Sequence, residues 1–125
     1  MSGILTLTLP MPAPVTNRRG GNGWRTVHSE KKRYAATCDA LQLRGEIPPP
    51  PSVPMGRAII SSVMHLGHAM DDDNAMIRHK VAIDWLKTRG YIVEDKKKVL
   101  TWAALPEQVV KRDGNYRLVL TLRAA

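Results

Sequence analysis

The chain has few cysteines and no long apolar runs, and each shortage excludes a class of protein. Cys38 is the only cysteine among 125 residues, so neither an intramolecular disulfide nor a zinc cluster of several thiolates is expected. No apolar run approaches the roughly 20 residues that span a bilayer. The apolar run that ends at Pro10 is short and has no basic segment before it, unlike a secretory signal. We therefore expect a cytoplasmic protein without a membrane segment.

Acidic residues are also scarce relative to basic ones. Nineteen Lys and Arg oppose eleven Asp and Glu, which gives a formal net charge of +8. Such a balance favours a phosphate-rich partner such as DNA or RNA, although a soluble protein can be basic without one. The length and the apolar fraction of 43% indicate one folded domain that spans residues 1–125.

The order of the expected elements indicates an α+β fold, in which two main helices pack on a small mixed sheet. Apolar periodicity predicts helices over residues 29–44, with Ser29 as N-cap, and over 74–89, before Gly90. Alternating or continuous apolar residues predict strands over 4–9, 57–66 and 98–104.

The C-terminal part of the chain carries a strong turn signal. Asp113-Gly114-Asn115 has the residue types of a tight turn. We therefore expect a β-hairpin with arms over residues 107–112 and 116–123.

The motif Asp71-Asp72-Asp73-Asn74 concentrates acid in a basic chain. Carboxylates ~5 Å apart repel by roughly 3 kcal/mol per pair at an effective dielectric constant near 20, so the cluster needs a cation, a helix N-terminus or solvent. In an extended segment Asp71 and Asp73 point the same way and could share a divalent cation such as Mg²⁺. Alternatively, Asp72 or Asp73 caps the following helix and the other acids are solvated. The spacing alone leaves both interpretations open.

A second acidic pair, Glu94-Asp95, follows the second expected helix. If the chain doubles back along that helix, Asp95 could meet Asp71 and Asp73 and add a third carboxylate to a metal site. Alternatively, Asp95 is a loop acid that pairs with its neighbouring lysines. Lys80 lies seven residues after Asp73, and it could reach a phosphate or be an ordinary surface lysine.

The remaining polar residues give weaker signals. His65 and His68 fit no standard zinc spacing, and His79 has basic neighbours on both sides, so we expect it to be exposed. Cys38 is expected to be a small buried hydrophobic residue. Five residues are our first candidates for DNA contacts, or else a solvated face: Asn17, Arg18, Arg19, Arg25 and Lys97.

Taken in order, these motifs resemble the RusA family of Holliday junction resolvases, which occur in lambdoid prophages, related phages and bacteria. The resemblance rests on Asp71-Asp72-Asp73-Asn74, then Lys80, Asp84-Trp85-Leu86, Gly90 and Glu94-Asp95. The opening Leu9-Pro10-Met11-Pro12 with Asn17-Arg18 is similar to the start of the family pattern. The spacing from Asn74 to Lys80 is longer than in the bacterial prototype and resembles phage-borne members.

The resemblance implies a homodimeric, Mg²⁺-dependent endonuclease, with Mn²⁺ as a substitute, that binds four-way DNA junctions and nicks two opposing strands. Carried over by position, Asp71, Asp73 and Asp95 would be the catalytic metal ligands and Lys80 the essential lysine. Asp72 falls at a position that varies in the family. Two alternatives share the same residues: a nuclease that prefers flaps or forks, and a junction-binding protein without catalytic activity.

Overall fold

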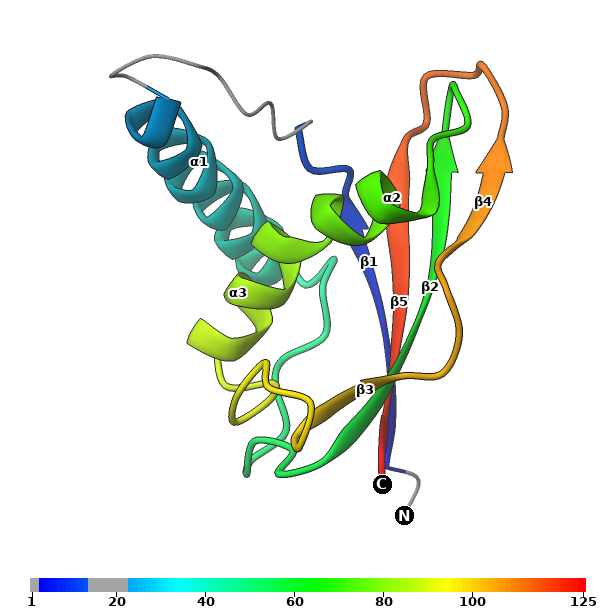
Figure 1. Ribbon diagram of the computed structural model, residues 1–125. Helices are drawn as coiled ribbons and strands as arrows, with labels where there is room; N and C mark the ends of the chain where they lie inside the picture. Colours follow the sequence, from blue (N-terminus) through cyan, green and yellow to red (C-terminus); the bar gives the residue numbers. More distant parts are fainter. Residues whose placement is uncertain (1–2, 14–22) are drawn as a thin grey trace.

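In the part of the chain that the structure describes, a five-stranded mixed β-sheet carries the helices on one side (Figure 1). The computed structural model describes residues 3–13 and 23–125, and for residues 23–27 only the backbone. The expected α+β fold is confirmed. Within the described ranges, no helix combines the length and the apolar character needed to cross a membrane.

The sheet is built around β2 (Ala58–Leu66) and β5 (Arg117–Ala124), which pair antiparallel. On the far side of β5, β1 (Ile4–Pro10) pairs antiparallel with it. Along the other edge of β2, two short strands pair parallel with it, one after the other. They are β3 (Leu100–Trp102) and β4 (Glu107–Val110).

Strict alternation along the strands separates the two faces of the sheet. In β5, Leu118, Leu120 and Leu122 are fully buried, whereas Val119 and Thr121 between them are partly exposed. The leucine face carries the helices, and together they enclose the hydrophobic core. The sequence pattern of the strands therefore fixes which face supports the helices.

The expected hairpin is wrong, although its turn is right. Gly114 has a positive φ of 75°, and the backbone N–H of Asn115 donates to Asp113 Oδ1 at 2.9 Å. The two flanking strands do not pair with each other, because both pair with β2, along opposite edges. The buried leucines of β5 suit the sheet interior, while β4, mostly exposed, suits an edge.

The first expected helix begins earlier than its sequence signal. Helix α1 spans Gly23–Leu43, so Ser29 lies inside it and does not cap it. Cys38 is fully buried on this helix, as expected, and burial raises the pKa of its thiol to about 12. The side chain therefore acts as a packing residue.

The second expected helix is divided into α2 (Asp72–Arg78) and α3 (Lys80–Thr88), with the break at His79. The expectation that His79 is exposed is wrong, because its side chain is 0% exposed. Its Nδ1 lies 2.7 Å from the carbonyl oxygen of Ala75, and its Nε2 lies 2.6 Å from Ser62 Oγ on β2. These contacts hold the junction of the two helices against the sheet. Gly90, with φ 82°, ends α3 as predicted.

Candidate functional site

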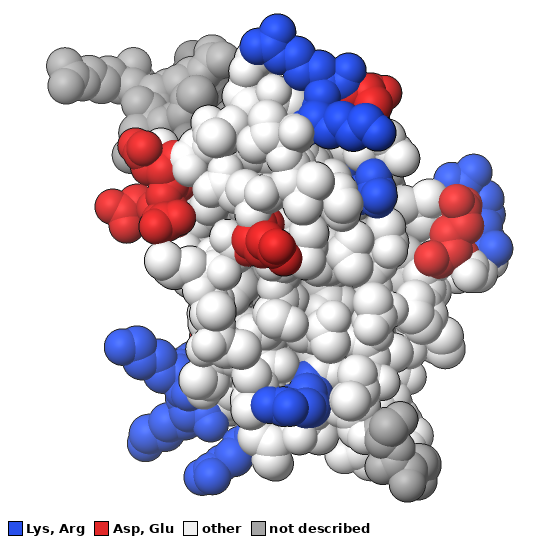
Figure 2. Space-filling model, turned by 90° about the vertical axis from the view of Figure 1, so that its right-hand side faces the viewer, with Lys and Arg blue, Asp and Glu red and all other residues white. Residues whose placement is uncertain are grey.

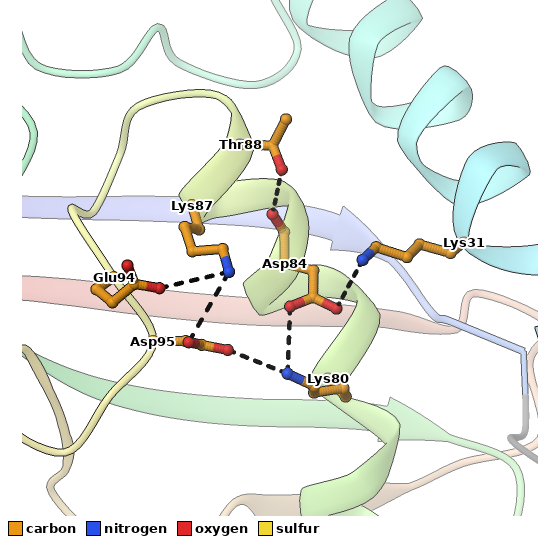
Figure 3. Close-up of polar contacts among 7 residues, drawn as sticks. All are labelled: Lys31, Lys80, Asp84, Lys87, Thr88, Glu94 and Asp95. Atoms are coloured by element: carbon orange, nitrogen blue, oxygen red, sulfur yellow. Dashed lines mark hydrogen bonds and ion pairs between the residues drawn. The ribbon is translucent and has the colours of Figure 1, made fainter. Parts of the chain in front are cut away.

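The first residue of α3 meets the loop that follows this helix. Lys80 Nζ lies 3.0 Å from Asp95 Oδ2 and 3.3 Å from Asp84 Oδ1, which is one turn further along α3 (Figure 3). The hydrogen bond to Asp95 is the main cause that raises the pKa of Lys80. The same hydrogen bond lowers the pKa of the Asp95 carboxyl. Both groups are therefore firmly charged at neutral pH.

Two further lysines extend this pair into a charged network (Figure 3). Lys31 Nζ, from α1, lies 3.4 Å from Asp84 Oδ2. Lys87 Nζ lies 3.5 Å from Glu94 Oε1 and 4.0 Å from Asp95 Oδ1. Lysines from α1 and α3 thus surround the carboxylates.

Asp84 is the carboxylate at the centre of this network, and the sequence pattern did not assign it to the site, as it did not assign Lys31 or Lys87. It is buried, with its side chain only 11% exposed, and it lies between Lys31 and Lys80. Its four-residue spacing from Lys80 is a signal that could have found this contact. The contact from Lys31 depends on how α1 packs on α3, which no local pattern in the sequence indicates.

The three consecutive aspartates lie at the N-terminus of α2. Asp71 is the N-cap residue, with an extended backbone, and its carbonyl oxygen accepts a hydrogen bond from the Ala75 N–H at 2.9 Å. Its side chain makes no capping hydrogen bond. Asp72 and Asp73 occupy the first turn, where the helix dipole favours negative charge. All three side chains are exposed.

The predicted three-carboxylate centre is not assembled in this arrangement. Among the residues whose side chains the structure describes, no three acidic, histidine or cysteine side chains come together in a way that could hold a metal ion. Asp71 and Asp73 offer exposed oxygen donors, which is the donor type that Mg²⁺ prefers. Asp95 is instead engaged by Lys80. The donor chemistry fits the cation, but the three donors are not gathered.

The candidate DNA-contacting residues are only partly covered by the structure. Asn17, Arg18 and Arg19 lie outside the described residues, and Arg25 belongs to the part of α1 of which only the backbone is described. Lys97 is exposed and lines a hollow next to Lys80 and Asp95. Figure 2 shows that Lys and Arg gather at the top and at the lower left of the face that lies on the right of Figure 1.

Comparison with protein-family models found no match for this chain. A search of curated proteins found no match either. Membership of the RusA family therefore stays a prediction that rests on the order and spacing of the motifs.

Proposed function

We propose that this protein is a Mg²⁺-dependent, structure-selective endodeoxyribonuclease of the RusA type, which acts on four-way DNA junctions in the cytoplasm. The observation that best supports this proposal is the contact of 3.0 Å between Lys80 Nζ and Asp95 Oδ2. Both residues belong to the motifs of the resemblance, and they are 15 residues apart in the chain. The net charge of +8 suits a polyanionic substrate.

The proposed reaction is hydrolysis of a phosphodiester. The oxygen of a water molecule gives up a proton and forms a bond to phosphorus, one phosphorus–oxygen ester bond breaks, and the leaving oxygen takes up a proton. Lys80, held in its protonated form, would bind the phosphate oxygens and counter the negative charge that develops on them. Asp84 would keep the ammonium group of Lys80 in place.

Mg²⁺ would be held by Asp71 and Asp73, with Asp95 as the third ligand that the resemblance implies. When bound, a divalent cation polarises the phosphodiester and lowers the pKa of an attacking water. Cutting two opposing strands symmetrically requires two active sites, so a homodimer belongs to the proposal.

The deciding experiment uses labelled four-way junctions of several sequences, with Mg²⁺ or with a chelator. We expect paired nicks only with Mg²⁺. Asp71→Asn and Asp73→Asn should abolish cutting and keep or strengthen junction binding, because removing negative charge eases the approach of phosphate. Asp113→Asn, in an exposed turn, is the matched control and should cut normally. Absence of paired nicks in every junction would refute the proposal.

A junction-binding protein without catalytic activity is the second candidate. The observation that favours it is the ion pair between Asp95 and Lys80. Among the residues whose side chains are described, Asp95 belongs to no cluster of three carboxylates that could hold a metal ion. Tight junction binding without cleavage at any Mg²⁺ or Mn²⁺ concentration would support it. A nuclease that prefers flaps or forks uses the same residues, and a panel of branched substrates distinguishes it from a junction resolvase.

A further inference from the structure

A hollow of about 440 Å³ lies directly beside Lys80 and Asp95. Residues of α2, α3 and β3 line it, and its wall is mostly apolar: Met76, Ile77, Ile83, Leu100 and Trp102. Its volume falls in the range of small-molecule sites, which combine apolar walls with a few polar groups. The network of ion pairs around Lys80 does not account for an apolar hollow at this place.

One wall of the hollow is an aromatic ring that is held in place by contacts with neighbouring side chains. Trp102 packs edge-to-face against the His79 ring, with the ring centroids 5.1 Å apart and an interplanar angle of 86°. His79 is itself fixed by its contacts with Ser62 and Ala75. The indole of Trp102 therefore forms a prearranged flat apolar surface, partly exposed to solvent.

The charges at the hollow indicate the kind of ligand. Lys80 and Lys97 line it together with one carboxylate, Asp95. Lys96 and Lys98, next to Lys97 in the chain, are exposed as well. An apolar wall with an aromatic ring, next to several ammonium groups, complements a molecule that joins a flat ring to a phosphate.

We propose that this hollow binds one unpaired nucleobase of a DNA strand, against Trp102, with the phosphate of the same nucleotide facing Lys80 and Lys97. This inference rests on the proposed function in that DNA is the ligand. Stacking on an aromatic side chain tolerates any base, because every base has an apolar face. Branched DNA presents bases that are already unpaired or easily unstacked, so the cost of inserting one is lowest at a branch point. The hollow would thereby contribute to the selection of branched substrates.

The test uses pentathymidylate and an oligonucleotide of the same length in which every residue is abasic, in the absence of divalent metal. Both carry the same phosphates, so only the bases differ. We expect the intact oligonucleotide to bind about tenfold more tightly, which is within the range for one stacked base. In ¹H–¹⁵N spectra the indole signal of Trp102 should shift on binding. The indole signal of Trp85, which is buried and hydrogen-bonded to Asp39, should not.

Two exposed isoleucines provide a matched pair of variants. Ile77, which is 52% exposed, lines the hollow, whereas Ile4, 54% exposed, lies on β1. Ile77→Gln should remove most of the preference for the intact oligonucleotide, and Ile4→Gln should preserve it. Because both side chains are half-exposed, both variants are expected to fold.

Equal binding of the two oligonucleotides, or an unchanged Trp102 signal, would overturn the inference even if the protein cuts junctions. A preference for the base without any cleavage would support the hollow as a base site and count against the nuclease. Self-association that Ile77→Gln abolishes, with no displacement by oligonucleotide, would assign the hollow to a second copy of the chain and overturn the inference.

Discussion

Lys80 Nζ and Asp95 Oδ2 lie 3.0 Å apart, and the two side chains are 64% and 22% exposed. An ion pair this open to solvent contributes only about 0–1 kcal/mol to stability. Little free energy is therefore lost when an incoming phosphate attracts the ammonium group of Lys80. The pair is better suited to exchange partners with a ligand than to hold the fold together.

Lys80→Ala should separate activity from stability. If Lys80 stabilises charge on the reacting phosphate, we expect cleavage to fall about 100-fold or more. The free energy of unfolding should change by less than about 1 kcal/mol, because the pair with Asp95 is exposed and Asp84 keeps its contact with Lys31. Single-turnover cleavage of a junction and urea unfolding measure the two effects. Lys87→Ala is the control, because it removes a second lysine that faces Asp95 at the longer distance of 4.0 Å. Equal losses of activity in both variants would contradict a specific role for Lys80.

Asp84→Asn tests whether this buried carboxylate positions Lys80. The amide keeps the shape of the side chain but loses the charge that attracts the lysines 3.3 and 3.4 Å away. We expect the rate of the cutting step to fall between about tenfold and a hundredfold, as for a misplaced catalytic group. Junction affinity should stay the same, and Asp84→Glu should restore part of the rate. Weakened binding with an unchanged rate would instead indicate a role in DNA binding.

The strands were largely predictable because their burial follows a local pattern. Alternating leucines mark the buried face of β1 and β5, and the structure confirms both strands. The break at His79 was not predictable, because the apolar periodicity of Ile77, Val81 and Trp85 continues across it. At the break, His79 contacts Ser62, a partner 17 residues earlier that no helical pattern can reveal. The predicted hairpin was wrong for a similar reason, because β4 and β5 each pair with β2, which is distant in the sequence.

The candidate site was predictable to a smaller extent. We expected Asp95 to meet Asp71 and Asp73 if the chain doubles back along the helix after Gly90, and Asp95 instead contacts Lys80 on α3. The structure does not gather Asp95 with Asp71 and Asp73, and a metal site formed by these three residues stays a prediction. The contact from Lys31 to Asp84 arises from the packing of α1 on α3, a tertiary feature.

His79 should make the protein less stable at mildly acidic pH. Its Nδ1 can only donate to the carbonyl oxygen of Ala75, so the neutral ring accepts from the Ser62 hydroxyl through Nε2. Burial lowers the pKa of His79 below its ordinary value. Below about pH 6.5 the unfolded state therefore takes up a proton that the folded state resists. The free energy of unfolding is therefore not reduced by His79 above that pH, and it falls as the pH decreases towards the lowered pKa of His79.

Urea unfolding at pH 7.5 and 5.5 measures this effect. We expect the free energy of unfolding to fall by no more than about 1.4 kcal/mol for this residue between these pH values, the limit for one proton over one pH unit. His79→Gln should be less stable at both pH values and lose this part of the pH dependence. His68→Gln, at an exposed position, should keep it. The same slope in His79→Gln and in the wild type would assign the effect to other groups.

Tyr91→Phe should destabilise the protein without affecting the site. The fully buried Tyr91 donates its hydroxyl hydrogen to the Pro48 carbonyl at 2.6 Å and accepts from Gln42 Nε2 at 2.7 Å. It thereby connects α1, the segment at Pro48 and the chain after α3. Its loss leaves both partners without this bond and should cost about 1–3 kcal/mol in the free energy of unfolding. Thermal unfolding measures the change, with Tyr116→Phe, at an exposed position, as the control. Junction cleavage at 25 °C should stay at the wild-type rate, and a large loss of cleavage in a folded Tyr91→Phe protein would show that this connection also positions the site.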